Sequence, residues 1–361
     1  MEVAPDAVPV LCGSGGRRHL MLISAREVVA RICAGATLFS LAMSSAAPAA
    51  GDKTYVMKIA LATVDDPLHE FAKNYAAALE KDSNGRIKVE IYPSSQLGAT
   101  QREAEGVQFG EIQCLVVPPE FLAGIDERFE VLAAPGLVKF MADGRRLAAD
   151  PAVRALMLGL GANKGLHGGA LFMVAQSSII ATTPIRRLAD LKGKKIRVFA
   201  SQFQAEAIQR LGATPKPMTL GDVLPALHDN AIDGAVSSVA VFTTMHYWDA
   251  AKYVTETGQP AIFGIVEFSK KWYDSLPSEL QQIVERDAQS QAAVTDPWMI
   301  DFNAKARQVW TDHGGELINL SAADQSAMLD ALASVGGDIS KSNPQLSAAY
   351  QIVTEAARHI H

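Results

Sequence analysis

Apolar and polar positions alternate along this chain with two spacings, one typical of strands and one typical of helices. Short segments such as 87–91 are apolar at every second position, whereas Leu68, Phe71, Tyr75 and Leu79 fall on one stripe of a helix. The elements predicted in the first part of the chain are strand 55–61, a helix from Asp66-Pro67 to Asn84-Gly85, strand 87–91, a short helix opened by the capping pair Thr100 and Glu103, and strand 112–117. This β-α-β-α-β succession predicts an α/β layer with helices on both faces of a largely parallel sheet.

A second set of the same kind follows. Its predicted elements are strand 170–175, strand 195–199, helix 201–211, strand 214–218, a helix that starts between Thr219 and Asp222, and strand 231–236. The tail from Ser278 is helical, Pro297 is expected to end or kink that helix, and 316–319 is a late strand. The 361 residues are enough for two cores, so we expect two α/β lobes joined by short strand-like crossings that form a hinge.

The first fifty residues have the order of a secretory signal peptide. Four arginines precede the apolar segment 32–43, and Ala47-Pro48-Ala49 then presents the A-x-A spacing of a cleavage site. The apolar segment is shorter than the roughly 20 residues that span a bilayer. We therefore expect 1–50 to be a signal peptide with an upstream extension, and the mature chain to be a soluble periplasmic protein. Met21 is followed by its own basic residues, which leaves Met1 and Met21 open as the start.

Charge and cysteine content narrow the possible partners. The 33 basic and 39 acidic residues give the chain a formal net charge of −6, and removal of residues 1–50 leaves a net charge of −7. No Lys/Arg run marks a nucleic-acid surface, so we expect no nucleic-acid partner. Cys12 and Cys33 leave with the leader, so Cys114 is the single mature cysteine and no intramolecular disulfide can form. It lies in the apolar strand 112–117, where we expect a core residue and not a nucleophile.

The usual catalytic motifs are missing from the sequence. It contains no G-x-S-x-G, H-E-x-x-H, Walker A or C-x-x-C pattern. His167-Gly168-Gly169 is interpreted as the glycine-rich start of a strand, and the glycines of 159–165 follow a helix pattern instead of opening one, unlike a dinucleotide fingerprint. We therefore expect no enzyme activity, no cofactor and no metal site.

Arg197 is the residue that the pattern leaves unexplained. It lies inside the apolar strand 195–199, whereas Lys192, Lys194 and Lys195 belong to a solvated turn. A buried guanidinium needs a partner, because an uncompensated buried charge costs roughly 3–5 kcal/mol. That partner is either a protein carboxylate or a ligand carboxylate, and the strand pattern alone leaves both open. The planar fork of arginine can hold a carboxylate through two parallel hydrogen bonds.

Several short sequence motifs, in the same order along the chain, resemble those of one family of receptors. From about Tyr55 to Val335 the chain is similar to the DctP-type solute receptors of tripartite ATP-independent periplasmic (TRAP) transporters. The matching phrases are 85–90 (GRIKVE), 92–98 (YPSSQLG), 190–198 (DLKGKKIRV), 211–215 (LGATP) with Met218, Ala226-Leu227 through Ile232-Asp233-Gly234, and 272–277 (WYDSLP).

This resemblance implies a two-lobed periplasmic-binding-protein-like fold of type II character, with hinge strands and a long helix bracing both lobes. It implies lobe I at 51–174 plus 263–302, and lobe II at 175–262 plus 303–356. It also implies closure over an organic acid, which is handed to the small and large permease subunits in the membrane without catalysis or ATP. A receptor domain that feeds a sensor kinase would look the same, and a secreted hydrolase or lyase is the remaining alternative.

The resemblance also implies where the ligand lies. Arg197 matches the family's carboxylate-binding arginine. At two other positions this chain departs from many members, with Gln176 in place of a second arginine and Ser237 in place of an asparagine, so the pocket has lost charge. Thr63, Pro118 and Phe121 of the first lobe and Phe199 of the second fall at cavity positions. We therefore expect a small monocarboxylate with an apolar or aromatic body, in preference to sialic acid or a dicarboxylate.

Overall fold

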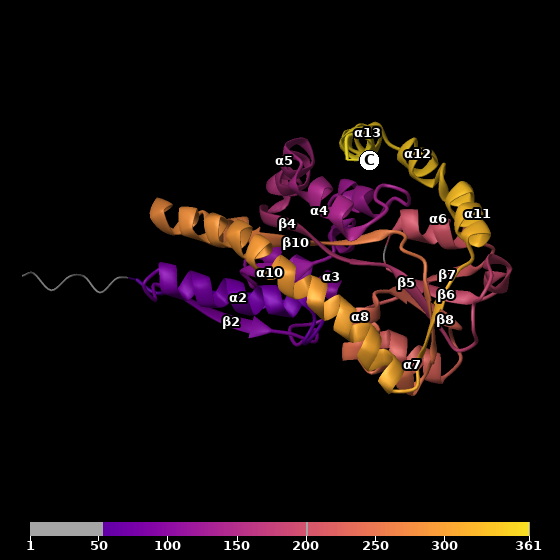
Figure 1. Ribbon diagram of the computed structural model, residues 1–361. Helices are drawn as coiled ribbons and strands as arrows, with labels where there is room; N and C mark the ends of the chain where they lie inside the picture. Colours follow the sequence, from indigo (N-terminus) through magenta and orange to yellow (C-terminus); the bar gives the residue numbers. More distant parts are fainter. Residues whose placement is uncertain (1–52, 200, 361) are drawn as a thin grey trace, which may run out of the picture. The chain divides into compact units, whose positions relative to one another are not determined.

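The computed structural model of the protein describes residues 53–199 and 201–360. The predicted signal peptide, its cleavage region and the two candidate starts lie outside these residues. Within them, the chain forms two mixed sheets covered by helices (Figure 1).

A five-stranded sheet, in the order β2-β1-β3-β10-β4, organises the first lobe. β1 pairs in parallel with β2 and β3, whereas β10 runs antiparallel to both β3 and β4. The strands are β1 (Tyr55–Ala60), β2 (Ile87–Tyr92), β3 (Cys114–Val117), β4 (Leu166–Gln176) and β10 (Ala261–Ser269). Cys114 is a buried free thiol in β3, as predicted.

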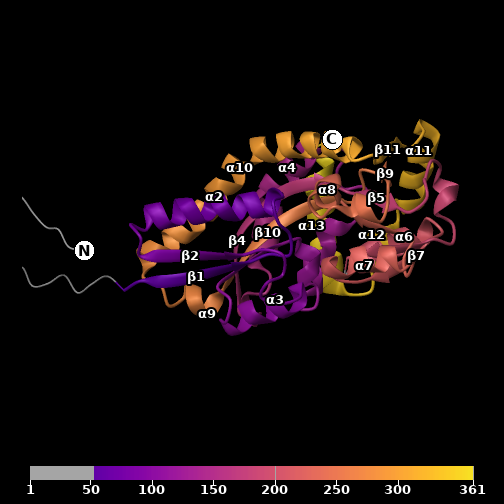
Figure 2. The ribbon, with the colours of Figure 1, turned by 90° about the horizontal axis from the view of Figure 1, so that it is seen from below.

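A six-stranded sheet, in the order β11-β9-β5-β8-β6-β7, organises the second lobe. β6 pairs in parallel with β7 and β8, and β5 runs antiparallel to β8 and β9. The strands are β5 (Ser178–Ala181), β6 (Lys195–Val198), β7 (Thr214–Pro217), β8 (Gly234–Ser237), β9 (Tyr253–Glu256) and β11 (Glu316–Asn319). Figure 2 shows the strands of the first sheet, such as β1 and β2, on one side and those of the second sheet, such as β5 and β7, on the other.

The two-lobed α/β class is confirmed, but the sheets are less parallel than predicted. β5, β9 and β10 were not expected from the pattern, and β5 and β10 supply the antiparallel pairs. Every residue of β10 is buried, so its sequence shows no polar and apolar alternation that would mark a strand. Two extended connections link the sheets, at Ser177 between β4 and β5 and at 257–260 between β9 and β10, and the helical segment Ser278–Asp312 makes a third passage from β10 to β11.

Helices cover both sheets, and one long helix contacts both lobes. The α-helices are α2 (Pro67–Asp82), α3 (Thr100–Phe109), α4 (Met141–Ala149), α5 (Pro151–Gly159), α6 (Gln202–Arg210), α7 (Val223–His228), α8 (Val239–Thr244), α9 (Lys270–Tyr273), α10 (Ser278–Asp312), α11 (Ala322–Leu332), α12 (Val335–Ser340) and α13 (Pro344–Arg358). α10 packs against α2 and β4 of the first lobe and against α8 of the second (Figure 1).

Pro297 does not end this helix, contrary to one of the two outcomes predicted for it. α10 continues for 35 residues with Pro297 inside it. Proline removes one backbone hydrogen bond from a helix interior, at a cost of about 3 kcal/mol. The burial of Val284, Met299 and Trp310 on both sides of the proline offsets that cost, since each lies in the core with no exposed surface.

The C-terminal helix belongs to the first lobe's core. Leu346 and Val353 of α13 are buried in the same apolar cluster as Leu147, Val153 and Met157 of α4 and α5. The predicted boundary, which placed 303–356 in lobe II, is therefore wrong for this helix. The reason is its amphipathic pattern, which finds its complementary apolar surface on α4 and α5 after α11 and α12 have carried the chain back across the second lobe.

Candidate functional site

Arg197 lies on β6 with no exposed surface. Its Nε donates a hydrogen bond to the Met218 carbonyl at 3.1 Å, and its Nη1 donates to the Val236 carbonyl at 3.2 Å. The third group, Nη2, is buried and has no hydrogen-bond partner among the described residues. Two bonds therefore fix the plane of the guanidinium and leave the Nη2 amino group unused.

The charge of Arg197 is not neutralised by an ion pair within residues 53–199 and 201–360. No carboxylate oxygen there lies within 4.0 Å of the guanidinium. Burial lowers the pKa of Arg197 to about 10, and the more distant Tyr247, Glu120 and Asp222 only partly oppose this. The sequence left a protein carboxylate open as the partner of Arg197, and the described structure contains no such pair.

Arg197 lines a nearly closed cavity between the lobes, which we call the Arg197 cavity. It offers a volume of about 40 Å³ to the centres of water molecules, enough for roughly three waters. Six of the seven residues predicted to bind ligand line it: Thr63, Pro118, Phe121, Arg197, Phe199 and Ser237. Residues that the sequence analysis did not connect with a site complete the wall: Ala62, Asp66, Leu68, Thr100, Val116, Val117, Val174, Leu220, Ser238, Val241 and Ile262.

Aromatic rings from the two lobes meet at this cavity. Phe121 follows β3 in the first lobe and Phe199 follows β6 in the second, and their ring centroids are 5.1 Å apart. The Arg197 guanidinium lies 4.7 Å from the centroid of the Phe199 ring, close enough for a cation–π interaction. The rings therefore cover the cation on one side and exclude water from it.

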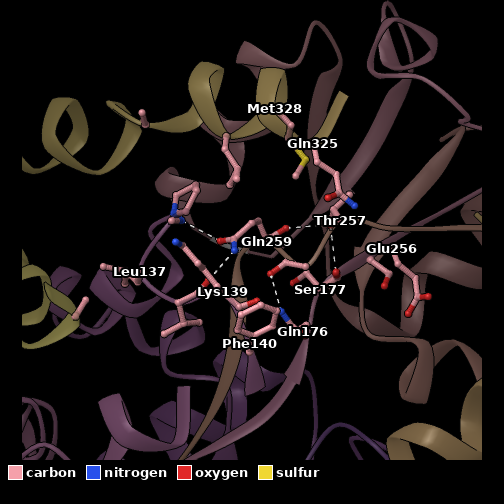
Figure 3. A pocket seen from close by; sticks show the side chains of 18 of the residues that line it. Leu137, Lys139, Phe140, Gln176, Ser177, Glu256, Thr257, Gln259, Gln325 and Met328 are labelled. Atoms are coloured by element: carbon pink, nitrogen blue, oxygen red, sulfur yellow. Dashed lines mark hydrogen bonds between the residues drawn. The ribbon is translucent and has the colours of Figure 1, made fainter. Parts of the chain in front are cut away.

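Gln176 does not belong to this group. It lies at the end of β4 in a second, larger cavity of about 860 Å³ beside the two crossings (Figure 3). Its side-chain amide donates hydrogen bonds to the Lys139 carbonyl at 2.9 Å and to the Gly258 carbonyl at 3.5 Å. In this structure Gln176 therefore does not line the Arg197 cavity, and its contact with the ligand stays a prediction.

The break in strand alternation explains the displacement of Gln176. The pairing of β4 with β10 shifts between Ile262 and Phe263, so Ala175 and Met173 have partners while Val174 between them has none. Such a bulge turns the residues beyond it to the opposite face. Val174 lines the Arg197 cavity, and Gln176, two residues further on, does not.

Buried carboxyl groups of the first lobe accept hydrogen bonds from α6 of the second. The Gln204 side-chain amide donates to Glu120 Oε1 at 3.2 Å, and the Gln202 backbone N–H donates to Glu130 Oε2 at 2.7 Å. Burial raises the pKa of Glu120 to about 7 and also raises the pKa of Glu130. These contacts hold the lobes together next to Phe199, whose backbone N–H donates to Gln204 Oε1.

The described residues enclose a cavity around the Arg197 guanidinium and hold no cluster of metal ligands. Across 53–199 and 201–360, no group of three or more His, Cys, Asp or Glu side chains is arranged to hold a metal ion. Over the same residues, no helix has both the length and the apolar character needed to cross a membrane. An unneutralised buried guanidinium in a largely apolar cavity can bind an anion, and carboxylate fits its fork.

Two lobes joined by extended crossings and a long helix, with a cavity between the lobes, are the architecture expected of a solute-binding protein. Comparison with known families agrees: residues 60–342 match the family DctP, bacterial extracellular solute-binding protein family 7, and the chain belongs to this family. It is a TRAP transporter periplasmic solute-binding protein, of a family that binds small organic acids and works with membrane permease components. The family's role is solute binding and not catalysis.

Individual relatives are similar to this chain over most of its length. The C4-dicarboxylate-binding periplasmic protein DctP of Rhodobacter capsulatus is 26% identical over 309 residues, which cover 85% of this chain and 92% of the relative. A TRAP periplasmic solute-binding protein of Desulfovibrio salexigens, solved with orotic acid, has a TM-score of 0.81 at 24% identity and covers 85% of this chain and 100% of its own. One from Xanthobacter autotrophicus Py2, solved with β-D-galacturonate, has a TM-score of 0.77 at 26% identity, with coverage of 84% and 99%.

Proposed function

We propose that the chain captures a small monocarboxylate with an apolar or aromatic body by closing its lobes over it, and delivers it to the small and large permease subunits of a TRAP transporter. In this proposal residues 1–50 act as a cleavable leader that brings the chain to the periplasm. The observation that carries the proposal is the buried Arg197 guanidinium, which has an unused Nη2 donor and no carboxylate partner among the described residues.

The lining of the Arg197 cavity supports a role for six of the seven residues predicted to bind ligand. The fork of Arg197 holds the ligand carboxylate and fixes its orientation. Pro118, Phe121 and Phe199 form the apolar part of the wall against the ligand's body. The Ser237 hydroxyl is available to donate a hydrogen bond to the ligand, whereas the Thr63 hydroxyl donates to Asp66 Oδ1 and can only accept one. Gln176 has no part in this proposal, because its amide is engaged with backbone carbonyls beside the crossings.

A single carboxylate fits the charge of this cavity best. The relatives described above are named for, or were solved with, a C4-dicarboxylate, orotic acid and β-D-galacturonate, all of them acids. Arg197 is the one cation among the residues that line the cavity, and most of the other lining residues are apolar. A second ligand carboxylate would be buried without a cationic partner, which is costly.

The test is a thermal-shift panel of mono- and dicarboxylic acids, followed by calorimetric titration of the hits. A ligand at about 100 times its Kd adds roughly 2.7 kcal/mol of stability, which the melting temperature reports readily. Arg197→Ala should lose most of the affinity and Arg197→Lys much of it, because an ammonium group cannot reproduce the fork. Arg187→Ala is the matched control, since that guanidinium is largely exposed.

Two results would count against the proposal. If only dicarboxylates raised the melting temperature, the proposed ligand class would be refuted. If Arg197→Ala and Arg197→Lys bound the hits as tightly as the Arg187→Ala control, the assignment of Arg197 would be refuted.

A further inference from the structure

A buried carboxyl group shares the cavity with Arg197. Asp66 caps the N-terminus of α2, is 1% exposed and lines the Arg197 cavity. Its Oδ1 accepts hydrogen bonds from the Thr63 hydroxyl at 2.8 Å and from the His69 backbone N–H at 3.0 Å. The sequence pattern at Asp66 marks only the start of a helix. That role accounts for the hydrogen bond from His69, but it does not account for the place of Asp66 in the cavity wall.

Asp66 has no cationic partner in the described structure. No Lys, Arg or His nitrogen of residues 53–199 and 201–360 lies within 4.0 Å of its carboxylate oxygens. Burial raises the pKa of Asp66 to about 6, while the hydrogen bonds from His69 and Thr63 lower it. The group is therefore mostly ionised at neutral pH, and its charge is compensated by dipoles alone.

The two unneutralised charges come from opposite lobes. Asp66 follows β1 in the first lobe, and Arg197 lies on β6 in the second. They line one cavity without forming an ion pair with each other, and most of the other residues that line it are apolar. The cavity thus combines a cation from one lobe, a carboxylate from the other and a largely apolar lining. The unused Nη2 donor of Arg197 is the independent sign that this wall faces a ligand.

We infer that Asp66 is a specificity-determining residue: it favours monocarboxylates whose far end carries a hydrogen-bond donor, a hydroxyl or an ammonium group, and it rejects a second carboxylate. This inference rests on the proposed function, because it assumes that the ligand carboxylate lies on Arg197. A ligand of this class would contact both lobes with complementary groups and would therefore favour the closed state. A dicarboxylate would place its second charge near the Asp66 carboxylate, where like charges repel.

The experiment uses acids that differ only at the far end. Butanoate, 4-hydroxybutanoate, 4-aminobutanoate and succinate share a four-carbon chain that ends in a methyl, hydroxyl, ammonium or carboxylate group, and the three-carbon series from propanoate to malonate covers a shorter span. Calorimetric titration at pH 7.5 gives the affinity of each acid. For the wild type we expect the hydroxy or amino acid to bind at least tenfold tighter than the methyl acid, and the diacid to bind weakest.

Two variants isolate the carboxylate from the helix cap. Asp66→Asn and Asp66→Ser keep a side chain that caps helices well, so α2 should form in both. Each should bring the affinities of the hydroxy and methyl acids within a few-fold of each other, and Asp66→Asn should improve binding of the diacid about tenfold. Asp65→Asn is the matched control, since the Asp65 side chain neighbours Asp66 in the sequence but is 77% exposed and does not line the cavity. It should leave all ratios unchanged.

The outcomes separate this inference from the proposed function. If the acids bind in an Arg197-dependent way but Asp66→Asn leaves the ratios between far-end groups unchanged, the role of Asp66 is overturned and the proposed function stands. If no acid of either series and none of the carboxylate panel binds the wild type, or if binding does not depend on Arg197, the proposed function fails and this inference fails with it. Melting curves of the ligand-free variants confirm that each is folded.

Discussion

Replacing Arg197 by methionine should abolish ligand binding with little change in the stability of the ligand-free protein. Methionine keeps the length and packing of the side chain but removes the charge. The change therefore tests whether the guanidinium serves the fold or a ligand. In the described structure it has no carboxylate partner, so its charge contributes little to holding the second lobe together.

Two opposing contributions decide how much the Arg197 guanidinium adds to the stability of the ligand-free protein: the cost of burying its charge and the hydrogen bonds that it donates. A pKa lowered from 12.5 to about 10 means that burial penalises the charged form by about 3 kcal/mol. Against this, the guanidinium donates hydrogen bonds to the Met218 and Val236 carbonyls, each worth about 1.5 kcal/mol when the donor is charged. The two contributions nearly cancel, so the free energy of unfolding of Arg197→Met should lie within about 1 kcal/mol of the wild type. A guanidinium bridged to a buried carboxylate would instead cost about 3–5 kcal/mol when removed.

The assay is urea unfolding of both proteins at pH 7, after bound ligand has been removed by unfolding, dialysis and refolding. Arg210→Met is the control for a guanidinium that does have protein partners, since Arg210 pairs with Glu206 at 2.7 Å and with Asp338 at 2.9 Å at the surface. It should lose about 1 kcal/mol and retain ligand binding. A loss of 3 kcal/mol or more in ligand-free Arg197→Met would refute the reasoning, because it would show that the fold itself depends on the charge.

Two further predictions concern groups that hold the fold around the site. The pKa of buried Glu120 is about 7 in the fold against 4.5 in an unperturbed chain, so the folded state binds more protons between these values and loses stability as the pH rises through them. Glu120→Gln should recover up to about 3 kcal/mol above pH 7 and almost nothing at pH 4.5, and parallel pH profiles of the two proteins would contradict this. A side chain at Gly168 of β4 would lie 2.5 Å from the Leu158 carbonyl oxygen, so Gly168→Ala should cost about 1–3 kcal/mol in thermal or urea unfolding. Gly159→Ala, which meets nothing within 4 Å, is its control, and equal stability of the two variants would show that the strand can shift.

The local sequence pattern was sufficient to single out Arg197, because a charged residue in an apolar strand conflicts with burial wherever the strand lies in the fold. A charged residue inside an apolar strand needs an explanation whatever the rest of the fold does, and the structure places it in an interior cavity. Phe121 and Phe199 depended on the family resemblance, since an apolar residue after a buried strand is equally expected in a core. Their meeting across the lobes is a long-range fact that no spacing along the chain encodes.

Asp66 and Gln176 show where the pattern was insufficient. The Asp-Pro pair at 66–67 marks a helix start, and that local role hides the fact that the same carboxylate lines the cavity of Arg197. Gln176 was assigned to the ligand by the family resemblance, and a bulge in β4 just before it accompanies its place outside the Arg197 cavity. Both positions depend on tertiary geometry, one on which lobe faces the carboxylate and the other on a single shift in strand register.

The unneutralised charges also bear on why the lobes should open without ligand. In the closed arrangement Arg197 is buried at a penalty of about 3 kcal/mol, and Asp66 is buried without a cation. Opening would return water to both groups and relieve that cost, whereas a ligand with a carboxylate and a hydrogen-bond donor would satisfy them in place. Each 1.4 kcal/mol of that cost that opening relieves shifts the equilibrium about tenfold toward the open form. Small-angle scattering should therefore report a more open form of the ligand-free wild type and a more closed form of ligand-free Arg197→Met, and identical profiles would show that this charge does not control closure.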